Sequence, residues 1–142
     1  MECKVEWMAA SGMAFSAQTG SGHLLVMDGA PDGGGNNLAP RPMQPLLAGA
    51  GGCTAYDVVL ILKRGLHDVT GCSVQLKAER AVTDPKVFTA INFHFVVRGR
   101  KLSEPAVLRA IELSHDRYCS ATAMLVKTAT ITTTHEVIDE AA

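Results

Sequence analysis

The stretch of residues 43–64 constrains the fold of this chain more than any other part of its sequence. Its apolar residues recur at the spacing of a helix, and Gly65 follows as a stop signal. The other faces of this helix carry mostly Ala, Gly, Tyr and Val. A helix that is apolar nearly all round belongs inside a protein, so we predict a largely buried central helix.

Glycine is unusually frequent inside this helix. Gly49, Gly51 and Gly52 precede Cys53, and each costs roughly 1 kcal/mol relative to alanine in a helix interior. We therefore expect another part of the structure to approach the helix backbone closely at these positions.

Segments on both sides of the helix have the features of strands. Three short strands, arranged as a meander, are predicted at residues 4–7, 14–17 and 23–27. Apolar and polar residues alternate over 72–79 and 91–98, which is typical of an antiparallel sheet with one face in water. A β-branched stretch at 128–138 is predicted to close the chain as a strand.

The segment after the second long strand is predicted to be helical. Ser103 and Pro105 have the positions of an N-cap and a first-turn proline, and the helix continues to His115. It breaks at residues 118–120, where Ser120 could cap a short second helix. We therefore expect a single α+β domain over residues 1–142, in which an antiparallel sheet packs against the central apolar helix.

Composition and charge exclude several classes of partner. The chain has 47% apolar and 19% charged residues, a formal net charge of -1 and no long basic run. These values argue against binding to nucleic acid or to an anionic membrane surface, and they favour a small neutral partner. Because no uninterrupted run of about 18 apolar residues and no signal-peptide pattern is present, we expect a cytoplasmic protein without a membrane span.

Neither a metal nor a cofactor is expected. The four cysteines, Cys3, Cys53, Cys72 and Cys119, are spaced too widely for a structural zinc site and should be reduced in the cytosol. The glycine-rich loop at 28–37 lacks the Gly-Lys-Ser/Thr ending of a phosphate-binding loop. Its glycines therefore indicate flexibility rather than phosphate binding.

Two of the cysteines have settings that can activate a thiol. Cys53 follows two glycines in the apolar helix, and Arg41 lies upstream, where the chain could fold back toward it. Cys119 lies at the helix break, where free N–H groups and the helix dipole favour a thiolate. Cys72 alternates with apolar strand residues and Cys3 is near the terminus, so both are expected to be inert. From spacing alone, the alternative that Cys53 and Cys119 also pack as small hydrophobic residues stays open.

Two further residues lie one helical step from these cysteines. His115 precedes Cys119 by one helical step and could tune its pKa, although a solvated helix face is the simpler interpretation. Asp57 follows Cys53 by a similar step, and a carboxylate there opposes thiolate formation unless it is paired.

The motifs around these cysteines resemble those of a known family. The paired-cysteine signature of the OsmC/Ohr family is similar to the run Pro42-Met43-Gln44-Pro45-Leu46-Leu47-Ala48-Gly49-Ala50-Gly51-Gly52-Cys53 followed by Tyr118-Cys119-Ser120. The likeness spans nearly the whole chain and includes Ser21-Gly22-His23, Met27-Asp28-Gly29 and Asp57-Val58-Val59. Within the family, the sequence most resembles the YhfA-like branch.

This resemblance implies an OsmC-like fold, an intertwined homodimer and the reduction of organic hydroperoxides in oxidative-stress defence. By position, Cys53 resembles the peroxide-attacking cysteine and Cys119 the resolving one, with an external dithiol as reductant. The sequence departs from the family pattern twice. Gln44 replaces a common glutamate, and the first strands lack the activating arginine, for which Arg41 is the candidate substitute. Arg41 would then hold Cys53 as a thiolate, and Gln44 would hydrogen-bond Arg41.

Two other functions are compatible with the same fold. A non-catalytic homodimer could bind a small apolar ligand in its interface cleft, and Gln44 and Asp57 keep this alternative open. A redox sensor could use the same two cysteines and respond by a change of shape rather than by turnover.

Overall fold

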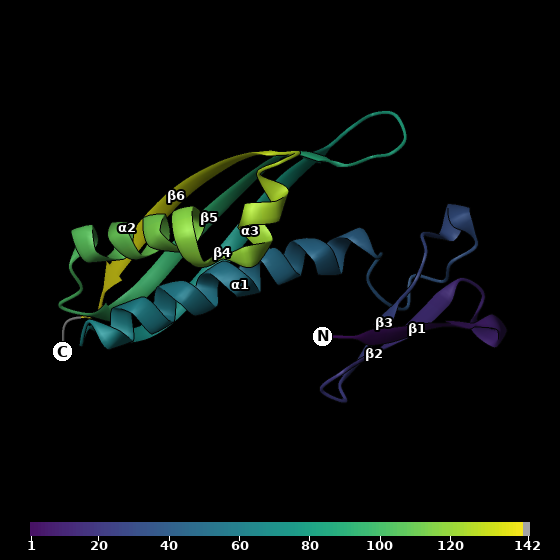
Figure 1. Cartoon of the computed structure of the whole chain (residues 1–142), viewed down its shortest axis with the longest axis horizontal. Helices are drawn as coiled ribbons and strands as arrows, with labels where there is room; N and C mark the ends of the chain where they lie inside the picture. Colours follow the sequence, from purple (N-terminus) through teal and green to yellow (C-terminus); the bar gives the residue numbers. More distant parts are fainter. Residues whose placement is uncertain (141–142) are drawn as a thin grey trace. The chain divides into compact units, whose positions relative to one another are not determined.

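The computed structural model describes residues 1–140, whose contacts divide into two compact units, residues 1–48 and the part from Gly49 onward (Figure 1). The first unit is built on three antiparallel strands in the order β1-β2-β3, which confirms the predicted meander. Its elements are β1 (Cys3–Met8), η1 (Ala9–Ser11), β2 (Ala14–Thr19), β3 (Leu24–Met27) and the short 3-10 helix η2 (Pro31–Gly33).

The sheet of the first unit leaves large apolar side chains in solvent. Trp7 is 59% exposed and Leu24 is 74% exposed, and Val5 is similarly open. Within these three strands, only Ala14 and Ala17 are buried. This sheet therefore has almost no core of its own within a single chain.

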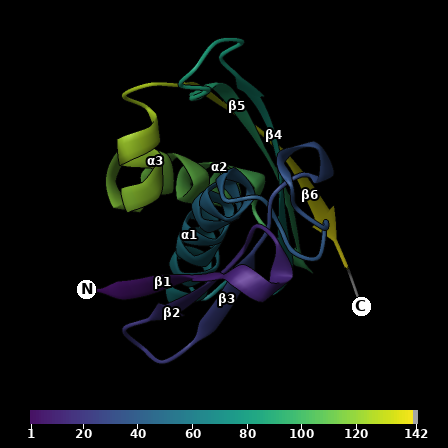
Figure 2. The ribbon, with the colours of Figure 1, turned by 90° about the vertical axis from the view of Figure 1, so that its right-hand side faces the viewer.

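The second unit contains a sheet with its helices on one face. The strands are β4 (Asp68–Arg80), β5 (Phe88–Arg100) and β6 (Thr130–Asp139), in the order β4-β5-β6. The helical elements are α1 (Met43–Arg64), which begins in the first unit, then α2 (Glu104–Leu113), the π-helical turn η3 (Ser114–Tyr118) and α3 (Ser120–Leu125). Figure 2 shows the helices of this unit on the same side of its sheet.

The direction of the last strand differs from the expected antiparallel pattern. Strands β4 and β5 are antiparallel as predicted, whereas β6 pairs parallel to β5, with Phe93 opposite Thr133. Parallel neighbours need a long crossover connection, and α2, η3 and α3 supply it. The α+β fold class is confirmed, and this sheet is mixed rather than wholly antiparallel.

The core of the second unit lies between the sheet and the helices. Strand β5 alternates buried and less buried residues, and the buried set supplies the largest side chains of this core. The fully buried residues of this core include Ile91, Phe93, Phe95, Val97, Val58, Leu62, Val107 and Ile111. The capping prediction for α2 is confirmed, because Ser103 Oγ accepts a hydrogen bond from the N–H of Ala106 at 3.3 Å.

The glycines of α1 divide into two kinds. A Cβ atom on Gly51 would lie 2.7 Å from Leu76 Cδ1 of β4, so close approach to the helix backbone is confirmed at this position. A Cβ atom on Gly49 or Gly52 would meet nothing within 4 Å, so the same expectation is wrong for these two residues within the chain.

The prediction of a largely buried α1 is wrong within a single chain. Its buried residues form a stripe at helical spacing, comprising Ala50, Gly51, Thr54, Val58 and Leu62. Tyr56 is 69% exposed and Leu46 is also open. By length and composition α1 could cross a membrane, but core helices of soluble proteins pass that same test. Other residues of the same chain therefore cover only part of the apolar surface of α1.

Candidate active site

The two candidate cysteines come from different helical elements of the second unit. Cys53 lies in α1 and is half-buried, whereas Cys119 is only 2% exposed and links η3 to α3. The structure brings the two side chains close enough for the Cys53 thiol to contribute to the raised pKa of Cys119. All four cysteines are free thiols.

The pKa of the Cys119 thiol is raised above its ordinary value. Burial is the largest cause, and the neighbouring Cys53 thiol adds to it. Thr122 acts in the opposite direction, because its hydroxyl and its backbone N–H donate to Cys119 Sγ at 3.1 and 3.4 Å. The N–H of Thr122 at the helix break lowers the pKa of Cys119 as expected, but desolvation outweighs it, so the expected stabilisation of a Cys119 thiolate is wrong on balance.

The helix break is a π-helical turn, a conformation that is frequent at functional sites. The carbonyl of Ser114 accepts the N–H of Cys119 at 2.7 Å, and Cys119 then leaves the helical conformation. Cys119 itself is the N-cap of α3, so the assignment of this role to Ser120 is corrected. The turn thus places the thiol at the junction of two helical segments.

Asp57 is paired in the structure. Its Oδ2 accepts a hydrogen bond from Ser114 Oγ at 2.8 Å, and Ser114 Oγ is also 2.8 Å from Thr54 Oγ1. Thr54 and Ser114 are fully buried. Sequence reasoning missed both hydroxyl residues, although a threonine on the apolar helix was a detectable signal.

Arg41 and Gln44 lie together at the start of α1, in the first unit. The backbone N–H of Arg41 donates to Gln44 Oε1 at 3.0 Å, and the N–H of Gln44 donates to the carbonyl of Arg41 at 2.9 Å. This reciprocal pairing satisfies backbone groups at a helix N-terminus. The Arg41 guanidinium donates to Asn37 Oδ1 at 2.6 Å. The expected contact between Gln44 and Arg41 therefore involves the arginine backbone rather than its charge.

The glycine-rich loop before α1 is organised around a buried carboxylate. Asp28 accepts hydrogen bonds from the N–H groups of Gly29, Asn36 and Leu38 at 2.7 to 3.1 Å. The bond from Leu38 is the main cause that holds the pKa of Asp28 below its ordinary value, and the charge of Arg41 acts in the same direction. These bonds hold the loop to the side chain of Asp28, whereas the sequence predicted a flexible loop.

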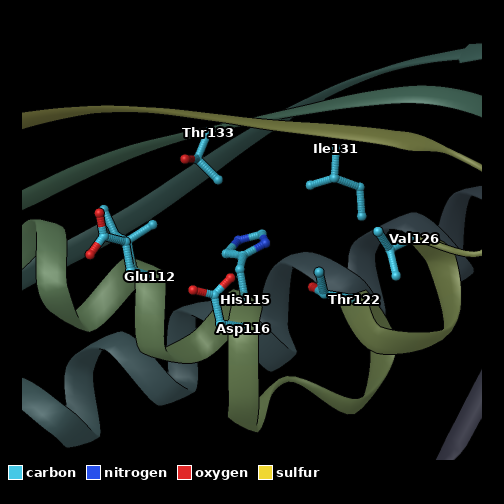
Figure 3. A pocket seen from close by; sticks show the side chains of 8 residues that line it. Glu112, His115, Asp116, Thr122, Val126, Ile131 and Thr133 are labelled. Carbon is cyan, nitrogen blue, oxygen red and sulfur yellow. The ribbon is translucent and has the colours of Figure 1, made fainter.

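His115 is half-buried rather than placed on a solvated helix face. Its ring packs edge-on against Phe93 and Phe95, with centroids 4.9 and 5.9 Å away. Neither ring nitrogen has a hydrogen-bond partner among residues 1–140, and burial lowers the pKa of the imidazole. Figure 3 shows the ring between Thr133 and Thr122. All three side chains line a cavity of about 250 Å³.

The remaining cysteines have different surroundings. Cys3 is exposed, and Cys72 is half-buried, with burial raising the pKa of its thiol. In the part of the chain that the structure describes, no group of three or more His, Cys, Asp or Glu side chains could hold a metal ion.

Comparison with known proteins extends this description. Residues 33–134 match the family model described as OsmC-like protein. The chain is 44% identical to Protein YhfA of Escherichia coli strain K12 over 138 residues, which cover 97% of this chain and 98% of that protein.

The chain belongs to the OsmC-like protein family.

Solved structures of other proteins share this fold. A hypothetical protein from Aquifex aeolicus VF5 is 28% identical with a TM-score of 0.84, and the match covers 98% of this chain and 96% of that one. An organic hydroperoxide resistance protein OsmC from Legionella pneumophila is 15% identical with a TM-score of 0.71, over 96% of this chain and 98% of that one. The OsmC-like fold expected from the two cysteine motifs is thus confirmed.

Proposed function

We propose that this OsmC-like protein is a cysteine-based hydroperoxide reductase in which Cys53 attacks the peroxide and Cys119 resolves the product. The observation that carries this proposal is the proximity of the two thiols, which come from α1 and from the end of η3. Two cysteines that served only as small hydrophobic residues would not need to be neighbours.

The reaction uses two thiols and one peroxide. The Cys53 thiolate attacks the distal oxygen of an organic hydroperoxide, the O–O bond breaks, and the alcohol leaves after taking a proton. The Cys119 sulfur then attacks the Cys53 sulfenic acid, and water leaves as the disulfide forms. An external dithiol reduces this disulfide and is itself oxidised.

Cys119 is suited to the second step rather than to the first. Its sulfur is buried and its pKa is raised, which disfavours a permanent thiolate that could attack a peroxide directly. The two donors from Thr122 can stabilise a thiolate that forms transiently at the resolving or reducing step.

For Arg41 we propose the role of the family's activating cation, and for Gln44 that of a residue that holds the start of α1. The guanidinium of Arg41 is bonded only to the neutral side chain of Asn37 among the described hydrogen bonds, so its charge is not cancelled by a direct ion pair there. The name of the Legionella pneumophila protein, organic hydroperoxide resistance protein, supports an organic peroxide as substrate.

We further propose that the working form is an intertwined homodimer with two sites at the subunit interface. The exposed apolar residues of β1 and β3 and the open face of α1 support this assembly, because a soluble chain rarely leaves so much apolar surface in water. Sedimentation at micromolar concentration should show a dimer, and a stable folded monomer would contradict this part of the proposal.

Peroxide consumption with a dithiol reductant tests the activity. The native protein should consume a bulky organic hydroperoxide faster than hydrogen peroxide, and Cys53→Ser should abolish turnover. Cys72→Ser is the matched control, because Cys72 is also half-buried in the second unit but takes no part in the proposed reaction. Equal losses in both variants would indicate damage to the structure, and no turnover by the native protein would favour a redox sensor or a ligand-binding dimer.

A further inference from the structure

A buried chain of hydrogen bonds connects the helix of Cys53 to the turn of Cys119. Thr54 directly follows Cys53 in α1, and its hydroxyl contacts that of Ser114, the first residue of η3. Ser114 contacts Asp57, which also lies on α1, and the carbonyl of Ser114 accepts the N–H of Cys119. One residue therefore links α1 to the backbone that carries the second thiol.

The direction of these hydrogen bonds follows from the number of available hydrogens. Ser114 has a single hydroxyl hydrogen and donates it to the Asp57 carboxylate, which can only accept. Ser114 must therefore accept from Thr54, so the bonds run from Thr54 to Ser114 to Asp57. The terminal acceptor is charged, which makes the Ser114–Asp57 bond the stronger of the two.

Because they are buried, these hydrogen bonds are specific for one arrangement of α1 and η3. Both hydroxyl groups are fully buried, so water cannot replace a bond that breaks. A shift of α1 against η3 by one helical turn would separate the two hydroxyl groups and leave both unpaired. Apolar contacts are less specific, because they tolerate small shifts of one helix against the other. A disulfide, in turn, forms only when its two Cα atoms lie within a narrow range of about 4.4 to 6.8 Å.

We propose that Thr54, Ser114 and Asp57 are positioning residues that hold Cys53 and Cys119 at the separation that a disulfide requires. This inference rests on the proposed redox role of the two cysteines. It also assigns Asp57 a purpose, since the carboxylate near Cys53 serves as the anchor of the chain.

The stability of the disulfide measures this positioning directly. With oxidised glutathione, the reduced protein forms the Cys53–Cys119 disulfide and releases two molecules of reduced glutathione. The equilibrium constant of this exchange reports how favourably the two thiols are placed. No peroxide takes part, so the measurement is independent of turnover.

Three variants differ in how many of these hydrogen bonds they remove. Ser114→Ala removes both bonds and should lower the equilibrium constant by about tenfold, equivalent to roughly 30 mV for a two-electron couple. Thr54→Val is isosteric, removes only the first bond and should lower the constant by roughly threefold. Thr54→Ser keeps the hydroxyl and should restore a value within about twofold of native.

Val58→Ala is the matched control for a simple loss of stability. Val58 is fully buried on the same stripe of α1 and its side chain has no hydrogen-bonding atom, so its truncation should lower the free energy of unfolding without changing the equilibrium constant. The inference is overturned if Ser114→Ala and Thr54→Val match the native constant, or if Val58→Ala shifts it as much as they do. If the native protein forms no disulfide at all, the resolving role of Cys119 fails as well, which is a separate outcome.

Discussion

The two three-stranded sheets of this chain differ in what covers them. In the second unit, α1, α2 and α3 cover one face of β4-β5-β6, and Phe93 and Phe95 are fully buried there. In the first unit, the strands β1-β2-β3 bury only two alanines and expose Trp7 and Leu24. One sheet therefore has its core within the chain, while the other presents an exposed apolar surface, which the proposed dimer would cover.

Truncation of one aromatic residue in each sheet should give the largest contrast. Phe93→Ala should lower the free energy of unfolding by about 3 to 5 kcal/mol, because it opens a cavity under His115 and the helices. Trp7→Ala should instead weaken the proposed dimer, so sedimentation should show more monomer. Urea denaturation and sedimentation of both variants measure these effects. If Trp7→Ala unfolded the chain as Phe93→Ala does, without any change in assembly, the contrast between the sheets would disappear.

The loop of the first unit should respond to acid through Asp28. Backbone N–H groups, chiefly that of Leu38, hold the folded pKa of Asp28 below its ordinary value of 3.8. A depressed carboxyl pKa stabilises the folded state above the unfolded pKa and loses this effect as pH falls through the folded pKa. Asp28→Asn should therefore be less stable than native at pH 7 and pH 5, with the difference shrinking below about pH 4. An unchanged difference at pH 3 in urea denaturation would mean that the charge of Asp28 has no part in it.

Two neighbouring glycines of α1 should separate the covered face of the helix from its open face. Gly52→Ala should stabilise the protein by about 0.5 to 1 kcal/mol, because alanine favours the helix and meets nothing within 4 Å in the chain. Gly51→Ala should gain less or lose stability, because its methyl group must displace Leu76. Thermal unfolding of the pair gives the difference directly. A loss for Gly52→Ala equal to that for Gly51→Ala would show that the partner subunit of the proposed dimer approaches the helix at Gly52 as closely as Leu76 does at Gly51.

The smallest effect is expected for His115 in the second unit, near neutral pH. Burial lowers the folded pKa of this imidazole below 6.5, so the unfolded chain binds a proton that the folded chain does not. Stability should therefore fall as pH drops from 6.5 toward the folded pKa. His115→Phe, which keeps an aromatic ring against Phe93 and Phe95, should remove this part of the pH dependence. A pH profile identical to native between pH 7 and pH 5 would assign the dependence to another group.

Much of the secondary structure could be predicted because it depends on neighbours in the sequence. The helix over 43–64 and its stop at Gly65, the Ser103 cap and the alternation along β5 all rest on periods or contacts of no more than about four residues. The proposal that Cys53 and Cys119 form the site also came from the sequence, through motifs that resemble those of the OsmC/Ohr family.

Other features depend on which distant residues packing brings together, and only the tertiary structure decided them. Local pattern could not specify that β6 pairs parallel to β5, because strand direction depends on the crossover formed by α2, η3 and α3. The sequence favoured a solvated helix face for His115, whereas its ring packs against Phe93. The bond between Ser114 and Asp57 joins residues 57 positions apart, and no period along the chain encodes such a pair. The sequence alone determined most of the helices and strands and indicated Cys53 and Cys119 as the candidate site residues, and long-range packing decided their surroundings.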